Sequence, residues 1–247
     1  DQIDPESTSK IKWVAKLGSQ TYGNPVVTQG LVLVGTNNET PQDPKYTGDR
    51  ACLYALEEAT GKLVWQLNIP KLGSGKVGDW EFLGICSSPA VQGDRVYIVT
   101  NLCEVICLDL KGMANGNDGV QDEKEYYGVE ELGDADADVI WRYNMSDELG
   151  VFPHNITSTS PLIHDGRVYV ATSNGVDWSH INIVNPLAPS LIALDAETGE
   201  LVGEEGAGIS QNLLHCNWSS PAYGEFAGQP TIVFGGGDGL LYGFDPT

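Results

Sequence analysis

The sequence predicts an all-β fold, and three observations support this prediction. First, the 247 residues include 30 glycines and 13 prolines and few long helix-forming stretches, which is typical of many short elements joined by turns. Second, the chain contains many short apolar runs rich in β-branched and aromatic residues, as half-buried or fully buried strands do. Third, these runs recur in the same order along the chain, which indicates a repeat architecture.

Four units share this order of strands. Each unit begins with Asn or Ser before Pro, at Asn24-Pro25, Ser88-Pro89, Ser160-Pro161 and Ser220-Pro221. A second strand is expected at residues 31–35, 95–100, 167–172 and 231–235. A third strand is expected at residues 53–56, 105–108, 191–194 and 241–244.

An acidic residue follows each third strand, at Glu57, Asp109, Asp195 and Asp245. Its carboxylate can accept hydrogen bonds from backbone N–H groups of the turn that begins there. Thr-Gly pairs at residues 60–61 and 198–199 then supply the positive φ that a hairpin needs. A fourth strand is expected at residues 63–67, 139–143 and 201–205, with tryptophan in the first two and Gly203 in its place in the third.

Four antiparallel strands per unit, repeated along the chain, predict a β-propeller. A β-sandwich is the alternative, but it does not require the same proline start and acidic turn four times. We predict blades at residues 24–67, 88–143 (with an insertion at 111–138) and 160–205, and a three-stranded partial blade at 220–247. Residues 11–17 match an isolated outer strand. Either this strand completes the last blade and closes a single four-bladed ring, or the chain is part of a larger ring completed by a further segment or another chain.

The first unit carries a specific motif, Ala55-x-Glu57-x-x-Thr60-Gly61-Lys62-x-x-Trp65. It resembles the tryptophan-docking repeat of quinoprotein propellers, the pyrroloquinoline-quinone-like (PQQ-like) repeat, and partial copies occur in the other units. The resemblance implies that Trp13, Trp65 and Trp141 dock between neighbouring blades. Rings of this family hold about six to eight blades, which favours the larger ring.

The resemblance leaves two functions open. One branch of the family binds PQQ with Ca²⁺ and oxidises alcohols or sugars, and the other keeps the scaffold without cofactor for assembly or interaction in the envelope. The alcohol-oxidising quinoproteins carry a disulfide between two adjacent cysteines over the quinone, and this sequence has no adjacent Cys-Cys pair. It also has no Cys-x-x-Cys-His motif for covalent haem. We therefore expect a non-catalytic, periplasmic or secreted binding platform of the bacterial cell envelope that needs no cofactor. A PQQ- and Ca²⁺-dependent dehydrogenase is the alternative.

Asn174 is the residue that best fits this alternative. The resemblance implies that an Asn directly after a second strand, four positions before Trp, supplies a Ca²⁺ ligand, and Asn174 and Trp178 have this spacing. They are therefore candidate cofactor-binding residues, with Asn174 as the metal ligand. Asn-Gly is also a common turn pair, so a purely structural turn is the other interpretation.

Strand order also predicts a binding face. The loops from strand four to the next strand one, and from strand two to strand three, open on the same side of a propeller. Those loops carry histidine, tryptophan and asparagine side chains, at Trp80, His154, Asn174, Trp178, His180, His215 and Trp218. Propellers commonly build binding sites on such loops, and packing between blades is the alternative. The fourth histidine, His164, is expected on the opposite face.

Charge and cysteine content limit the partners and the compartment. The 34 acidic and 13 basic residues give a formal charge of −21, which disfavours nucleic acid and anionic membrane surfaces. No run of about 18 apolar residues occurs, so no membrane-spanning helix is expected. The start at Asp1, without Met or an apolar leader, suggests a processed protein or a fragment. An oxidising compartment would allow a disulfide among Cys52, Cys86 and Cys103. Residues 111–138 are rich in oxygen ligands, and we expect them to be a solvated acidic loop rather than a metal site.

Overall fold

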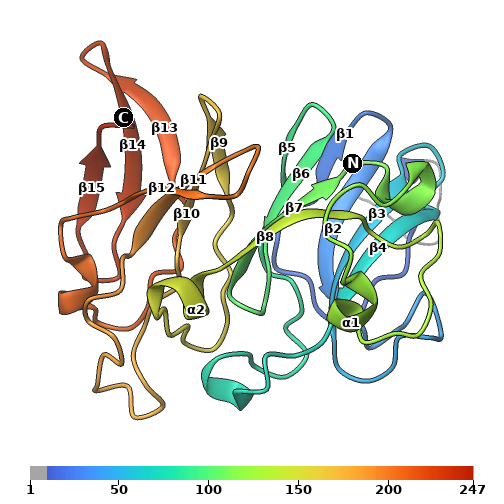
Figure 1. The fold of residues 1–247 in the computed structure, drawn as a ribbon, viewed down its shortest axis with the longest axis horizontal. Helices are drawn as coiled ribbons and strands as arrows, with labels where there is room; N and C mark the ends of the chain where they lie inside the picture. Colours follow the sequence, from blue (N-terminus) through green and yellow to red (C-terminus); the bar gives the residue numbers. More distant parts are fainter. Residues whose placement is uncertain (1–9, 247) are drawn as a thin grey trace.

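The computed structural model describes residues 10–246, which form four antiparallel sheets that follow one another along the chain (Figure 1). The first sheet consists of β1 (Val26–Thr28), β2 (Leu31–Asn37), β3 (Ala51–Glu57) and β4 (Leu63–Ile69). The second consists of β5 (Ala90–Gln92), β6 (Arg95–Val99), β7 (Glu104–Asp109) and β8 (Val139–Asn144). In both sheets the spatial order of the strands equals their order in the chain.

The third and fourth sheets repeat this meander. The third consists of β9 (Leu162–His164), β10 (Arg167–Ala171), β11 (Leu191–Asp195) and β12 (Leu201–Glu204). The fourth has three strands, β13 (Ala222–Phe226), β14 (Gln229–Gly235) and β15 (Leu241–Phe244). Short helices lie in the connections: η2 (Gly75–Val77), η3 (Gly112–Asn115), α1 (Glu123–Tyr127), α2 (Met145–Leu149) and η4 (Ile209–Asn212). The predicted all-β architecture of propeller blades is confirmed, and no helix within residues 10–246 has the length and apolarity to cross a bilayer.

Residues 11–17 do not form the expected strand. They pair with none of the four sheets, and Val14 is 84% exposed. The segment is held by side chains instead. The indole N–H of Trp13 donates to the Glu58 carbonyl oxygen at 2.7 Å, and Ala15 and Leu17 pack against apolar residues of the first sheet. Tryptophan docking and apolar contact therefore replace a backbone ladder in this segment.

The Asn or Ser that opens each unit links it to the next. The backbone N–H of Asn24 donates to Ser88 Oγ at 2.8 Å, that of Ser88 donates to Ser160 Oγ at 2.9 Å, and that of Ser160 donates to Ser220 Oγ at 2.9 Å. The first strands of successive sheets, β5, β9 and β13, are accordingly neighbours. These bonds give the repeated Ser-Pro start a physical role, because each hydroxyl accepts a bond from the preceding sheet.

The acidic turns act as predicted in the second and third sheets. Asp109 Oδ1 accepts the backbone N–H of Lys111 at 2.7 Å. Asp195 Oδ1 accepts the N–H groups of Glu197 and Thr198, both at 2.9 Å. Hydrogen bonding to the Thr198 N–H lowers the pKa of the Asp195 carboxyl. Glu57 differs, because its carboxylate accepts the Thr60 hydroxyl.

Tryptophans close the first two contacts between sheets. Trp65 is fully buried, and its indole N–H donates to the Leu110 carbonyl oxygen at 2.8 Å. Trp141 donates to the Ala196 carbonyl oxygen at 3.2 Å. Its ring lies over Gly199, where an added Cβ would come within 2.6 Å of the indole. Each tryptophan therefore packs on the turn of the following sheet.

The insertion at residues 111–138 exposes most of its acidic residues, as expected for a solvated acidic loop, but three of them are withdrawn from water. Glu123, Asp136 and Asp138 are buried. Asp136 binds Lys45 Nζ at 2.6 Å and the hydroxyl of Tyr46 at 2.8 Å, both from the connection between β2 and β3. The expectation therefore holds for most of the insertion, and its exceptions are Asp136, held by partners far away in the sequence, and Glu123 and Asp138, bound by Asn117 and by the Asp118 N–H within the insertion.

The five cysteines are buried free thiols. The considered disulfide among Cys52, Cys86 and Cys103 is therefore not formed. Each of these thiols lies near an oxygen instead, with Cys52 Sγ 3.8 Å from Asn38 Oδ1 and Cys86 Sγ 3.7 Å from the Leu83 carbonyl. Burial raises the pKa of the Cys52 and Cys86 thiols to about 12.

Candidate functional site

Three of the four histidines form one cluster in the structure. His154 comes from the connection between α2 and β9, His180 from the loop between β10 and β11, and His215 from the connection between η4 and β13. One ring nitrogen from each histidine lies within 4.8 Å of those of the other two. His180 Nδ1 and His215 Nε2 lie 3.1 Å apart. Three loops that the strand order placed on one face thus supply one compact group of imidazoles.

His154 is the buried member of the cluster. Its Nδ1 lies 2.6 Å from the carbonyl oxygen of Val176. Since that oxygen can only accept, Nδ1 carries the proton and Nε2 keeps its lone pair. Nε2 is buried without a hydrogen-bond partner among the described residues. Burial lowers the pKa of His154, and burial followed by the neighbouring histidines lowers the pKa of His215.

A short bridge between two loops brings the histidine backbones together. Gly175 pairs with Cys216, and the Val176 N–H donates to the His215 carbonyl at 2.9 Å. An added Cβ at Gly175 would lie 2.7 Å from His154 Cβ and 3.0 Å from the His215 carbonyl oxygen. Only glycine fits at this position without displacing one of the two histidines.

The loop of His180 is ordered by a side-chain turn. Asp177 accepts the N–H of Ser179 at 3.0 Å and the side-chain amide of Asn182 at 2.9 Å. The Ser179 hydroxyl and these bonds lower the pKa of the Asp177 carboxyl to about 2. His180 itself has a φ of 59°, a left-handed conformation that non-glycine residues adopt rarely. The turn thus holds an exposed histidine toward His215.

Trp218 packs against the histidines, and Trp80 and Trp178 stack on each other. The Trp218 ring centroid lies 4.8 Å from that of His215 and 6.3 Å from that of His154. Trp80 and Trp178 stack at 6.2 Å with an interplanar angle of 22°. Trp178 is 55% exposed, and Trp80 and Trp218 are each 36% exposed. We call these six residues the tryptophan-histidine face: Trp80, His154, Trp178, His180, His215 and Trp218.

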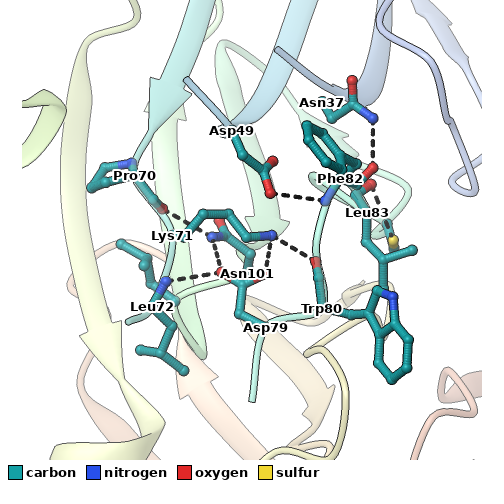
Figure 2. Close-up of polar contacts among 12 residues, drawn as sticks. Asn37, Asp49, Pro70, Lys71, Leu72, Asp79, Trp80, Phe82, Leu83 and Asn101 are labelled. Atoms are coloured by element: carbon teal, nitrogen blue, oxygen red, sulfur yellow. Dashed lines mark hydrogen bonds and ion pairs between the residues drawn. The ribbon is translucent and has the colours of Figure 1, made fainter. Parts of the chain in front are cut away.

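The connection that carries Trp80 is fixed by buried polar contacts (Figure 2). Asp79 pairs with Lys71 and accepts the Leu72 N–H at 2.9 Å and the Asn101 amide at 2.7 Å. Burial raises the pKa of the Asp79 carboxyl, although Lys71 and these hydrogen bonds act against the shift. The backbone N–H of Trp80 donates to the backbone carbonyl oxygen of Asn155 at 2.6 Å. This links the connection to the segment that carries His154.

An open pocket adjoins the face beside Trp218. Its lining mixes apolar and polar side chains from the connections of the first three sheets: Tyr22, Leu83, Cys86, Asn155, Ile156, Ser158 and Trp218. The Trp218 indole N–H donates to the Ile156 carbonyl at 3.3 Å. The tryptophan is therefore shared between the pocket and the histidine cluster.

Asn174 lies next to this face but is committed to the fold. It is fully buried, and its side-chain oxygen accepts the N–H of Phe152 at 3.0 Å. Its amide nitrogen donates to the Asn185 carbonyl at 2.9 Å and to Ser210 Oγ at 3.0 Å. A calcium ion needs about six to eight oxygen ligands at an accessible centre. The surroundings of Asn174 do not fit a calcium ligand or a PQQ site, and we derive no chemistry through them.

His164 lies outside the face, and two residues next to the face have roles that the sequence did not predict. His164 lies on β9 and stacks on Tyr223 with a centroid distance of 3.8 Å, away from the cluster. Sequence reasoning missed the roles of Gly175 and the Val176 carbonyl. Gly175 directly follows Asn174, and this pair gave only a turn signal.

Fold and site together define the class of protein, a propeller-blade array of PQQ-like repeats with a loop face rich in histidine and tryptophan. Residues 46–247 match the family model described as outer membrane protein assembly factor BamB. This match covers most of the chain, and the chain belongs to that family. No curated protein sequence matches it.

Solved structures show the same fold at low sequence identity. BamB from Moraxella catarrhalis aligns over 95% of this chain and 49% of its own, with 16% identity and a TM-score of 0.53. The quinohemoprotein alcohol dehydrogenase ADHIIG from Pseudomonas putida HK5 aligns over 95% and 34%, with 15% identity and a TM-score of 0.55. A europium-containing methanol dehydrogenase aligns over 90% and 39%, with 16% identity and a TM-score of 0.53. The chain spans about half the length of the BamB chain and a smaller share of the two dehydrogenases.

Proposed function

We propose that this chain is a non-catalytic binding platform of the bacterial envelope that docks a protein partner on the tryptophan-histidine face. The observation that carries the proposal is the gathering of three exposed tryptophans on one face, around the histidines and beside an open pocket. Exposed aromatic side chains that lie together are the usual anchors of protein interfaces. Membership of a family described by envelope assembly supports the envelope location.

The charge of the chain indicates the kind of partner. With a formal charge of −21, the surface attracts a partner that carries lysine and arginine around an apolar centre. Ile181 lies next to His180 and is 79% exposed, which adds apolar surface to the face. The partner we expect therefore has a basic rim and an apolar or aromatic centre.

Site-specific crosslinking tests the proposal. A photoreactive residue at position 178 should crosslink one protein in the native cells, and the adduct is identified by mass spectrometry. The control is position 226, since Phe226 is also exposed but lies on the β13–β14 hairpin of the last sheet. The same adduct from both positions would show that the face is not specific.

The purified partner then allows a quantitative test. The double change Trp80→Ala and Trp178→Ala should weaken binding by about tenfold or more. The melting temperature should change little, because both rings are partly exposed. A large fall in melting temperature with unchanged affinity would show that the stacked pair serves packing only.

The dehydrogenase alternative has a direct test. The chain is reconstituted with PQQ and Ca²⁺ and assayed for dye-linked oxidation of alcohols and sugars. We expect no turnover, since Asn174 is committed to the Phe152 N–H and to Ser210. Turnover that disappears in Asn174→Ala would overturn the proposal of a non-catalytic platform.

We also propose that the four sheets are part of a larger ring. Residues 11–17 dock on the first sheet through Trp13 rather than pairing with β15. Light scattering should then show association with further copies or with a separate chain that carries more blades. A monomer near 26.5 kDa that is stable to dilution would favour self-closure instead.

A further inference from the structure

We propose that His154, His180 and His215 form a binding site for a divalent transition-metal ion of the zinc class. The proposal does not depend on the partner-binding function. It rests on the positions of the three imidazoles, on an orphaned ring nitrogen and on the chemistry of the groups around them.

The spacing of the ring nitrogens is close to that of a metal site. Zn–N bonds of about 2.0–2.1 Å in a tetrahedral site place the ligand nitrogens about 3.3 Å apart. His180 Nδ1 and His215 Nε2 are 3.1 Å apart, and all three ligand nitrogens lie within 4.8 Å of one another. The widest separation, at most 4.8 Å, must therefore contract to about 3.3 Å for the three nitrogens to bind one ion.

The hydrogen bonding of His154 suits a metal ligand. Its Nδ1–H is fixed by the Val176 carbonyl at 2.6 Å, and this leaves the lone pair of Nε2 free to bind a metal ion. That nitrogen is fully buried and unpartnered within the described part of the chain. Leaving a buried polar atom unpaired costs about 1–3 kcal/mol. Metal-binding histidines typically donate their second N–H to a carbonyl in this way, so a bound ion explains both nitrogens of His154.

The neighbouring groups decide which ion fits. Three neutral imidazoles favour zinc, copper or nickel over calcium and magnesium, which prefer oxygen ligands. Cys216 does not add a sulfur ligand, because its thiol donates to the Ser173 carbonyl at 3.0 Å. Asp177 is engaged by Ser179 and Asn182. The site therefore offers three nitrogen ligands.

Three protein ligands leave one coordination position open. Tetrahedral zinc sites with three histidines hold water or an external ligand in the fourth position. His154 closes the buried side of the cluster and His180 lies on the exposed side. The fourth position thus faces solvent, where water or a side chain of a docked molecule can occupy it.

Metal titration of the intact chain, prepared without a histidine tag, tests the proposal. Isothermal titration with Zn²⁺ in the presence of excess Ca²⁺ should show one ion per chain, and elemental analysis after dialysis should agree. Excess Ca²⁺ occupies the many carboxylates of this acidic surface and leaves nitrogen sites available. Co²⁺ in place of Zn²⁺ should give the visible absorption of a four-coordinate site.

Variants separate this site from other binding. His180→Ala changes an exposed side chain, so it should keep the melting temperature of the metal-free chain and weaken Zn²⁺ binding by more than about 100-fold, since even changes to outer contacts cost 10–100-fold. His215→Ala should weaken Zn²⁺ binding to the same extent. The matched control is His164→Ala, which removes the histidine outside the cluster and should leave the affinity unchanged.

Three results would overturn the proposal: Zn²⁺ binding that persists in the His180→Ala and His215→Ala double variant, an equal loss of affinity in His164→Ala, or the absence of binding to the wild-type chain. These outcomes are distinct from a failure of partner docking, which is measured with the Trp80 and Trp178 changes and needs no metal.

Discussion

The contact between the first and second sheets and the contact between the third and fourth sheets use the same repeat positions but are filled differently. At the first contact, Trp65 lies opposite Ala55 on the neighbouring strand, is fully buried and binds the Leu110 carbonyl. At the last contact the corresponding position is Gly203, opposite Ala193. A cavity of about 160 Å³ opens there, and Gly203 is part of its wall.

The second contact is intermediate and shows what the last one lacks. There Trp141 and the hydroxyl of Tyr97 both donate to the Ala196 carbonyl. At the last contact the Tyr169 hydroxyl still donates to the corresponding Pro246 carbonyl at 2.7 Å, but no indole is present. The polar contact is therefore retained while the apolar filling is lost, which shows that the two parts of the docking contact are separable.

The insertion strengthens the first contact further. Gln66 of β4 exchanges backbone hydrogen bonds with Ala135 and Ala137, and Tyr127 of α1 is fully buried in the same apolar cluster as Trp65. No such segment covers the last contact among residues 10–246. We therefore expect the first contact to contribute more to the free energy of unfolding than the last one.

The largest expected effect is at Trp65. Trp65→Ala should lower the free energy of unfolding by about 3–5 kcal/mol, because it leaves a cavity in a fully buried site. Urea denaturation followed by circular dichroism measures the loss. A loss of free energy of unfolding below about 1 kcal/mol would show that the Trp65 indole contributes little to the first contact, and the first contact would then not be the stronger one.

A smaller gain is expected from the reverse change. In Gly203→Trp the new ring enters the cavity, since nothing lies within 4 Å of an added Cβ at Gly203. Filling the cavity should raise the free energy of unfolding by about 0.5–2 kcal/mol, measured by the same denaturation. Gly206→Trp, at a glycine that is also free of neighbours but outside the cavity lining, is the control and should give no gain.

A pH-dependent effect should distinguish the second sheet from the last. Glu104 of β7 is buried, accepts the Tyr126 hydroxyl at 2.6 Å, and has a pKa that burial raises above the ordinary 4.5. The folded chain therefore holds this proton to higher pH than the unfolded chain. The contribution of Glu104 is most favourable below the unfolded pKa and is lost as the pH rises through the folded pKa.

Denaturation at a series of pH values checks this sign. Glu104→Gln should become more stable relative to wild type as the pH rises from below the unfolded pKa to neutrality. Glu225→Gln, at an exposed glutamate of the last sheet, should show no such trend. A difference between wild type and Glu104→Gln that does not vary with pH would contradict the assignment.

The smallest effect is expected at Val14. Since Val14 is exposed and makes no ladder, Val14→Pro should change the free energy of unfolding by less than about 0.5 kcal/mol. Differential scanning calorimetry is sensitive enough to detect more. A large loss would mean that residues 11–17 pair with β15 and close the ring, and the last sheet would then not be the weaker end.

The sequence was sufficient for the strands of the four sheets and for the loops that share a face, because both follow from short periodic patterns and strand order, but it wrongly predicted a strand at residues 11–17. The strand order alone assigns Trp80, Trp178 and the three clustered histidines to loops of one face. The sequence did not predict the burial of Asp136, whose partners Lys45 and Tyr46 lie far away in the chain. Close packing of this kind depends on distances that a one-dimensional pattern does not contain.

The same limit applies to the site itself. The strand order brings His154, His180 and His215 to one face, but not to within bonding distance of one another. That step depends on Gly175, whose missing side chain lets two backbones meet, and on the Val176 carbonyl that orients His154. Neither residue type is distinctive in a sequence, and their roles emerge only from the three-dimensional contact.

The stacked pair of Trp80 and Trp178 has an optical consequence. Two indoles 6.2 Å apart are close enough for their excited states to couple, so the pair should give a signed doublet in the ultraviolet circular dichroism spectrum. Its members come from the connection after the first sheet and from a loop of the third sheet. Any movement of one indole relative to the other changes the doublet. The circular dichroism spectrum therefore reports the relative position of these two loops at the tryptophan-histidine face.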